Sequence, residues 1–176
     1  MDQGIDQEAR LRRLANQLEL IHSQRELLEF VAAEVRNSVG YMTTWLGVFD
    51  SGENEYRVLA SELAGGEDLW SSAVPIAADG DPHIDMIRAT RQTQIVIDAQ
   101  IDENVNREIV EQLGNRTIIN IPIEVNGELF GALGTGTFGE EGPRPPDDTE
   151  LSYLEQVGAI AGSSLSRMLK LAGHIA

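Results

Sequence analysis

The sequence predicts an α+β fold built around an antiparallel sheet. Residues 117–125 and 128–138 are rich in apolar and β-branched residues, and Asn126-Gly127 joins them. Asn-Gly supplies the two positive-φ positions of a type I′ turn, so the two segments should form a β-hairpin. Segments with apolar residues at helical spacing open and close the chain. Terminal helices around hairpin-joined strands are typical of the α+β class.

Two helices should precede the first strand. Apolar residues recur at helical spacing along 7–21, which predicts the first helix. Ser23, with Glu26 three residues later, forms a capping box that opens a second helix running to about Ser38. Gly40 is expected to end it.

The middle of the chain should alternate short strands with short helices. Asp81-Pro82 is an N-cap followed by a proline at the first helical position, which predicts a helix to about Ala89. A further helix is expected at 104–113, with Gly114 at its C-terminal cap. Further strands are expected at 41–49, 55–61, 73–76 and 94–97.

A long helix should close the chain. Asp147, with Glu150 three residues later, caps a helix expected to reach about Leu171. Apolar and small residues recur along it at a spacing of three and four: Leu151, Leu154, Gly158, Ala161, Leu165 and Met168.

The hairpin turn also predicts which side chains share a face. If Val125 pairs with Glu128, one face is wholly apolar beyond the turn, with Ile119, Ile121 and Ile123 opposite Gly134, Ala132 and Phe130. The other face mixes Leu133 with the polar residues Asn120 and Thr135. Such a sheet suits helices on one side and a small-molecule pocket on the other, and either hairpin face remains a candidate lining for that pocket.

Composition narrows the partners and the chemistry. Thirteen Lys and Arg residues against 29 Asp and Glu give the 176-residue chain a formal charge of −16, so neither nucleic acid nor a membrane surface is expected as a partner. The chain has no cysteine, which excludes disulfides, thiolate metal sites, thiol nucleophiles and thioether-linked chromophores. No secretory signal and no apolar run of about 18 residues is visible, so a cytoplasmic location is expected.

No motif points to catalysis or to a metal site. Residues 134–139 match G-x-G-x-x-G, but three prolines follow where a dinucleotide fingerprint would open a helix. A protein kinase needs a strand lysine soon after such a loop, and the only lysine is Lys170. These glycines should instead let a neighbouring element approach the strand. We therefore expect a protein that is not an enzyme.

The candidate ligand-binding residues are Trp45, Trp70, His83, Asp98, Arg107, Asn120, Leu133 and Thr135. Trp70 is either a lid over the pocket or a core plug, and His83 either binds a ligand or haem iron, or only packs near its helix start. Asp98 lies near Asp102, which is expected to cap the following helix, and Arg107 would be the counter-charge for an acidic ligand.

Three passages resemble a GAF domain, the ligand-sensing module of bacterial signalling proteins. Glu26–Gly52 is similar to the family's entry helix and first strand. Arg91–Asp98 is similar to a recurring passage in which a basic or small residue and a polar residue precede an apolar strand that ends in Asp. Thr117–Thr135 is similar to a strand with an apolar-Pro-apolar step followed by a hairpin and Gly-x-Leu. The resemblance covers about Gln24 to Met168 and implies a PAS-related antiparallel sheet of about six strands. It also implies terminal helices packed on one face and a pocket under short helices and loops on the other.

The resemblance implies a division of the chain and a function. Residues 1–23 would be a signalling or dimerisation helix, 24–170 the GAF domain, and 171–176 the start of a linker to an output domain such as a histidine kinase or diguanylate cyclase. The apolar stripes of the first and last helices would be either a homodimer seam or core packing only. Bilin-binding and methionine-sulfoxide-reducing members use cysteines, and cyclic-nucleotide-binding members use an Asn-Lys signature, and this sequence has neither. The expected function is a non-catalytic sensor of an unidentified small effector, and the alternative is a ligand-free dimerisation scaffold.

Overall fold

The structure, a computed structural model, describes residues 2–49, 55–62, 76–77 and 81–172. Six strands form one sheet in the order β3-β2-β1-β6-β5-β4, and every neighbouring pair is antiparallel. The strands are β1 (Thr43–Phe49), β2 (Glu55–Glu62), β3 (Ile76–Ala77), β4 (Gln94–Val96), β5 (Asn115–Val125) and β6 (Glu128–Phe138). The expected α+β sheet of about six strands is confirmed.

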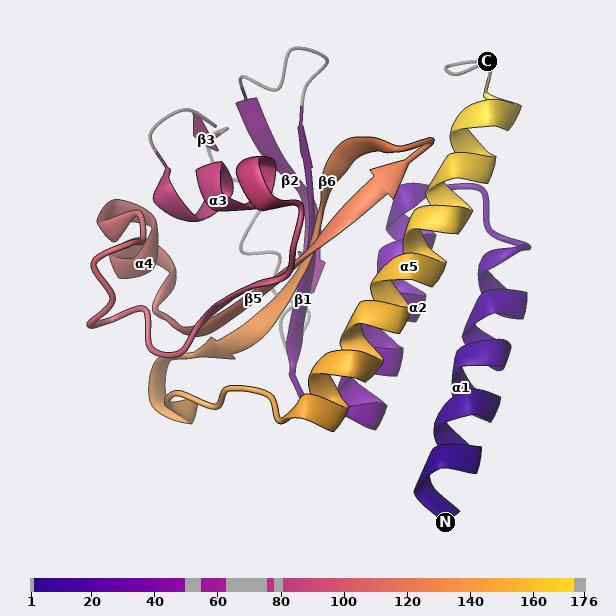
Figure 1. Cartoon of the computed structure of the whole chain (residues 1–176), viewed down its shortest axis with the longest axis horizontal. Coiled ribbons are helices and arrows are strands. Elements are labelled where there is room, and N and C mark those ends of the chain that lie inside the picture. The colour runs from indigo at the N-terminus through magenta and orange to yellow at the C-terminus, as the bar shows by residue number, and fades with distance from the viewer. Residues whose placement is uncertain (1, 50–54, 63–75, 78–80, 173–176) are drawn as a thin grey trace.

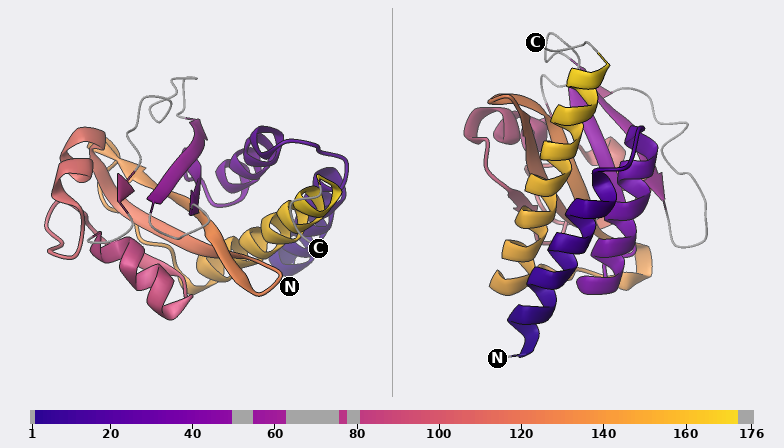
Figure 2. Two further views of the ribbon diagram at one scale, coloured as in Figure 1. Left: turned by 90° about the horizontal axis from the view of Figure 1, so that it is seen from above. Right: turned by 90° about the vertical axis from the view of Figure 1, so that its right-hand side faces the viewer.

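The helices divide between the two faces of the sheet, as Figures 1 and 2 show. On one face lie the long helices α1 (Asp2–Leu18), α2 (Gln24–Ser38) and α5 (Asp148–Leu171), and on the other the short helices α3 (Pro82–Thr90) and α4 (Arg107–Leu113). A one-turn 3₁₀ helix, η1 (Gly139–Glu141), follows β6. None of the helices in the described ranges is both long and apolar enough to cross a bilayer.

Local sequence explains where most helices begin and end. The Ser23 and Asp147 side chains each accept the backbone N–H three residues later, so both expected N-caps are confirmed. Gly114 adopts the left-handed conformation after α4, as expected for its C-terminal cap. The cap expected at Asp102 is wrong, because α4 begins later and Asn106 caps it.

The main hydrophobic core lies between the sheet and the three long helices. Ile119, Ile121 and Ile123 of β5 are buried in it, and β5 packs against α5. A Cβ at Gly158 of α5 would lie 2.7 Å from Ile121 Cγ2, so this glycine lets the helix approach the strand closely. The apolar face of β5 is therefore the face that the terminal helices cover, as the alternation of the sequence predicts.

The pairing of the hairpin changes partway along β6. Val125 pairs with Glu128 as expected, and Glu124 with Leu129, but the next pair is Ile123 with Gly131. Phe130 is therefore an extra residue in β6, which is a β-bulge. Because side chains alternate along a strand, this one residue shifts every later position of β6 to the face opposite to the one expected.

Helix α1 packs outside α5 and α2 and runs in the same direction as α5 (Figure 1). Ser164 Oγ and an Arg167 guanidinium nitrogen of α5 donate to the carbonyl oxygen of Leu18, at 2.9 and 2.7 Å. These bonds satisfy a carbonyl at the C-terminal end of α1, where no helical partner is available. The end of α1 is thereby tied to α5.

Candidate functional site

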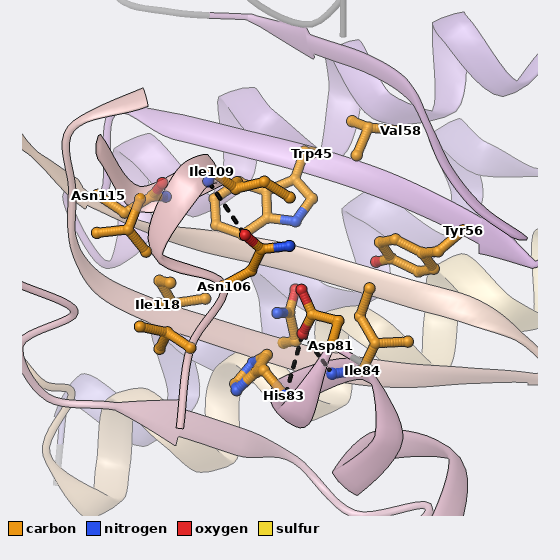
Figure 3. A pocket seen from close by; sticks show the side chains of 13 residues that line it. Trp45, Tyr56, Val58, Asp81, His83, Ile84, Asn106, Ile109, Asn115 and Ile118 are labelled. Carbon is orange, nitrogen blue, oxygen red and sulfur yellow. Dashed lines mark hydrogen bonds between the residues drawn. The ribbon is translucent and has the colours of Figure 1, made fainter. Parts of the chain in front are cut away.

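A small pocket lies between the sheet and the two short helices (Figure 3). Its volume is about 70 Å³, which is enough for a few water molecules or a small ligand. The described residues that line it are Trp45, Tyr56, Val58, Asp81, His83, Ile84, Val105, Asn106, Ile109, Val110, Asn115, Ile118 and Asn120.

Gly134 of β6 lies beneath two of the lining side chains. A Cβ at this position would lie 2.0 Å from atoms of the Trp45 indole and 2.5 Å from Asn120 Oδ1. Only a residue without a side chain therefore lets the indole and the amide lie against the strand. The sequence-based interpretation of this glycine, that it lets a neighbouring element approach the strand closely, is confirmed here.

The start of α3 supplies the charged and ionisable groups of the pocket. The buried carboxylate of Asp81 accepts the backbone N–H groups of His83 and Ile84, at 3.0 and 3.1 Å, both on its Oδ1 atom. Burial lowers the pKa of His83, and the attraction of Asp81 and Asp102 only partly opposes this shift. His83 is therefore neutral at pH 7, and one of its ring nitrogens is an acceptor.

Four of the residues that line the pocket carry a buried polar atom that has no hydrogen-bond partner within the described part of the chain. These atoms are Tyr56 Oη, His83 Nε2, Asn115 Oδ1 and Asn120 Oδ1. Tyr56, Asn115 and Asn120 are 4%, 3% and 7% exposed, so bulk water does not replace the missing partners. Leaving a buried polar group unpaired costs about 1–3 kcal/mol, which makes this concentration of such groups in one pocket unusual.

The charge of the pocket comes from one residue. Among the described lining residues there is no arginine or lysine, and Asp81 is the only acidic residue. Burial, and to a lesser extent the charge of Asp81, raises the pKa of Tyr56, so its hydroxyl stays protonated. The pocket therefore combines a negative charge with neutral hydrogen-bonding groups.

The structure brings three of the expected ligand-binding residues together in this pocket: Trp45, His83 and Asn120. Leu133 and Thr135 lie on the other face of the sheet, so their placement in the pocket is corrected. Leu133 belongs to the core beneath the long helices, and Thr135 donates to the Thr43 carbonyl at 2.7 Å. The cause is the bulge at Phe130, which reverses the faces of β6 beyond it.

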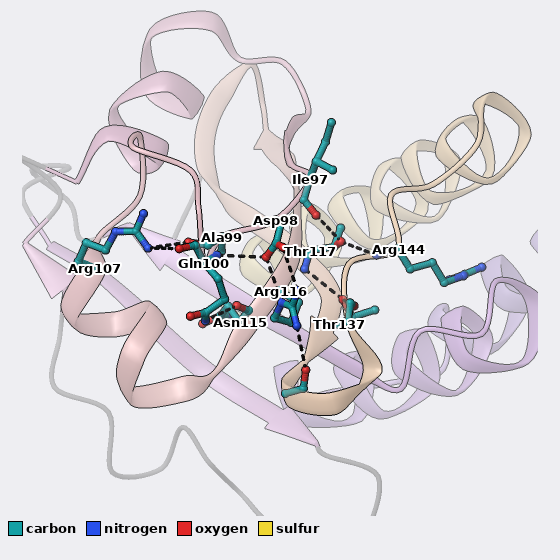
Figure 4. A network of polar contacts seen from close by, with 12 residues as sticks. Ile97, Asp98, Ala99, Gln100, Arg107, Asn115, Arg116, Thr117, Thr137 and Arg144 are labelled. Carbon is teal, nitrogen blue, oxygen red and sulfur yellow. Dashed lines mark hydrogen bonds and ion pairs between the residues drawn. The ribbon is translucent and has the colours of Figure 1, made fainter.

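Asp98 and Arg107 do not line the pocket either, because nearby groups occupy both side chains (Figure 4). Arg116 donates two hydrogen bonds to the Asp98 carboxylate, at 3.0 and 2.9 Å, and the bonded guanidinium lowers the pKa of Asp98. Arg107 donates to the carbonyl oxygens of Ala99, Gln100 and Asp102, at 2.6–3.1 Å. Both side chains hold the loop before α4. Arg107 is therefore not placed to be the counter-charge for an acidic ligand in this pocket.

Trp70 lies outside the described residues. The pocket also contains residues that the sequence did not single out for it: Tyr56, Asp81, Asn106 and Asn115. Asp81 was recognisable only as a helix cap, and the Asn106 side chain accepts the Ile109 N–H at 3.3 Å as the cap of α4. Within the described ranges, no group of three or more His, Asp or Glu side chains is arranged to hold a metal ion.

Comparison with known proteins agrees with this architecture. The structure is similar to the GAF domain of an Acinetobacter phosphoenolpyruvate-protein phosphotransferase, with a TM-score of 0.73 and 15% identity over 96% of this chain and 98% of that one. The chromophore-binding domain of a bacteriophytochrome from R. palustris has a TM-score of 0.76 and 12% identity, over 98% of this chain and 64% of that one. A free methionine-R-sulfoxide reductase from Neisseria meningitidis, in complex with its substrate, has a TM-score of 0.73 and 16% identity, over 98% of this chain and 95% of that one.

At these identities the likeness shows the fold alone. No curated protein sequence matches the chain. The sequence profile described as "GAF domain" matches residues 22–166, which is most of the chain. The chain therefore belongs to the GAF domain family.

Proposed function

We propose that this chain is a non-catalytic sensor that binds a small effector in the pocket between the sheet and helices α3 and α4. GAF domains are typically sensory or regulatory modules of signalling proteins, and this general role supports the proposal. The neighbour from Neisseria meningitidis is an enzyme, so the fold alone does not decide the question. This chain has no cysteine, and its pocket contains no activated nucleophile among the described residues.

One observation carries the proposal: four residues that line a single pocket carry buried polar atoms without hydrogen-bond partners in the described structure. Native proteins satisfy nearly all buried polar groups, and groups left unpaired need an explanation. A ligand with complementary groups would provide the missing hydrogen bonds to Tyr56, His83, Asn115 and Asn120. The energetic cost of leaving these groups unpaired would then be recovered on binding.

A short physical path links this pocket to the terminal helices. Asn120 faces the pocket, and the next residue of β5, Ile121, packs against Gly158 of α5 on the other side of the sheet. A ligand that moves Asn120 therefore acts on the backbone that also holds Ile121. Helix α5 in turn holds the end of α1 through Ser164. The proposed output is a change in the geometry of α1 and α5, which requires a ligand with different affinities for the two arrangements.

A thermal-shift screen with a metabolite panel, combined with native mass spectrometry of the freshly purified protein, tests the proposal. We expect at least one compound to raise the melting temperature and to add its mass to the protein. The variant Asn120→Leu should lose this response, and Asn37→Leu, at an exposed position of α2, should keep it. A panel with no binder, or a binder that Asn120→Leu retains at full affinity, would contradict the proposal.

A ligand-free dimerisation scaffold is the second candidate. A surface groove runs beside α5 and is lined in part by small residues of that helix: Gly158, Ala159, Gly162 and Ser163. Small side chains allow a second helix to approach closely. Sedimentation velocity separates the candidates, because a scaffold would form the same dimer with and without every compound in the panel.

A further inference from the structure

We propose that the effector of this pocket is a small primary ammonium ion with a short apolar chain, and that Asp81 binds its charged end. This inference rests on the proposed function, because it names the ligand class for the same pocket. Three features carry it: the sign of the charge in the pocket, the kind of hydrogen-bonding atoms left unpaired, and the shape of the apolar remainder.

The charge of the pocket selects a cation. Asp81 is the only acidic residue among the described lining residues, and it is 6% exposed. Its Oδ1 atom bonds two backbone N–H groups, whereas its Oδ2 atom accepts no hydrogen bond from any described residue. A carboxylate in so little water repels an anion strongly and attracts a cation strongly. The net charge of −16 adds a long-range attraction for cations.

The start of α3 does not oppose this selection. A helix N-terminus normally attracts anions, but here the Asp81 carboxylate already occupies that position. The burial that lowers the pKa of His83 keeps this imidazole neutral, so it adds no positive charge to the pocket. An anionic ligand would therefore meet the Asp81 carboxylate and no compensating positive charge among the described lining residues.

The unpaired atoms are mainly acceptors. Asn115 Oδ1 and Asn120 Oδ1 can only accept, and the Tyr56 hydroxyl oxygen can accept as well as donate. An ammonium group has three N–H donors and no acceptor, which complements Asp81, Asn120 and Tyr56. The aromatic rings of Trp45 and Tyr56 also line the pocket, and aromatic rings attract cations.

The rest of the pocket suits a short apolar chain. Apolar side chains contributed by the segment around α4 and by β5 form it: Val105, Ile109, Val110 and Ile118. Figure 3 shows Ile109 and Ile118 on the side of the pocket away from Tyr56. The volume of about 70 Å³ suits a small ligand, such as an ammonium group on a short carbon chain.

Three probes with three carbon atoms each test the inference: 1-propylamine, which is protonated at pH 7, neutral 1-propanol, and anionic propionate. Titrations followed in ¹H–¹⁵N spectra report both affinity and site, because the side-chain amides of Asn115 and Asn120 and the indole N–H of Trp45 lie in the pocket. We expect propylammonium to shift these signals at lower concentration than the other two probes.

Two charge variants on α3 make the comparison specific. Asp81→Asn removes the charge but keeps a good N-cap, and it should weaken propylammonium binding by at least about tenfold. Asp85→Asn removes the same charge from the same helix outside the pocket lining and should change the affinity by less than about twofold. Tyr56→Phe keeps the ring and should weaken binding roughly threefold or more, which gives a second test if Asp81→Asn does not fold.

Propanol or propionate binding as tightly as propylammonium, or an unchanged affinity in Asp81→Asn, would overturn the ammonium inference. In either case binding in the pocket would still support the sensor function. If none of the three probes shifts the pocket signals, the ammonium inference fails. The sensor function is tested separately, by the metabolite panel and the Asn120→Leu variant.

Discussion

Replacing Tyr56 by phenylalanine should stabilise the ligand-free protein. The protein has three tyrosines, and all three are buried. Tyr41 donates to the Arg144 carbonyl at 2.8 Å, and Tyr153 donates to the Glu34 carboxylate at 2.6 Å. The Tyr56 hydroxyl alone has no partner in the described structure. The same chemical change, loss of one hydroxyl, can therefore be compared at a paired and an unpaired position.

The expected sizes follow from the cost of burying hydrogen-bonding groups. An unpaired buried hydroxyl costs about 1–3 kcal/mol, so its removal in Tyr56→Phe should raise the free energy of unfolding by about 1 kcal/mol. For a chain of this length that corresponds to about 2–4 °C in melting temperature. Tyr153→Phe removes a bond to a carboxylate and should lower the free energy of unfolding by about 1.5–3 kcal/mol.

Urea unfolding at 25 °C, followed by far-ultraviolet circular dichroism, measures both variants. The prediction requires the midpoint to rise in Tyr56→Phe and to fall in Tyr153→Phe, with the same dependence on urea concentration in both. A fall of 1 kcal/mol or more in Tyr56→Phe would refute the reasoning, because it would mean that this hydroxyl makes a strong bond in the ligand-free protein. The argument for a ligand at Tyr56 would then fail with it.

Two further predictions concern the floor and the imidazole of the pocket. Gly134→Ala places a Cβ 2.0 Å from the Trp45 indole, so it should lower the free energy of unfolding by about 1–3 kcal/mol. The near-ultraviolet circular dichroism spectrum should also change, because the indole must move. An unchanged spectrum and an unchanged urea midpoint would contradict this packing. Burial lowers the pKa of His83 below its ordinary value of about 6.5, so below that pH the unfolded chain binds more protons than the folded protein. The free energy of unfolding should therefore fall between about pH 7 and 5, and His83→Gln should reduce this fall, as urea midpoints at several pH values will show.

The sequence was sufficient for most of the fold because the controlling signals are local. Ser23, Asp81 and Asp147 each cap a helix where expected. Asn126-Gly127 makes the hairpin turn, and the first pairs beside it are those predicted. Caps and turns depend on side chains within a few residues, so their physics is visible in one sequence.

The site was less predictable because its composition depends on contacts between distant residues. Asp98 pairs with Arg116, 18 positions away, and Arg107 donates to the carbonyls of a preceding loop, so both side chains hold the loop and neither lines the pocket. The residues next to a carboxylate in the sequence do not show whether a distant arginine pairs with it or whether it is free to bind a ligand. Asn115 and Tyr56 were missed for the converse reason, because their lack of a partner is a property of the folded structure.

The single extra residue at Phe130 also affects how this hairpin can be aligned with those of its relatives. A relative whose second strand lacks the bulge is one residue shorter there, and a gap placed a few positions away would exchange inward and outward side chains along the rest of the strand. Such an alignment would assign Leu133 to the pocket side of the sheet and would hide the role of Gly134 beneath the Trp45 indole. Transfer of binding residues between these proteins should therefore begin by locating the bulge, before any single position is compared.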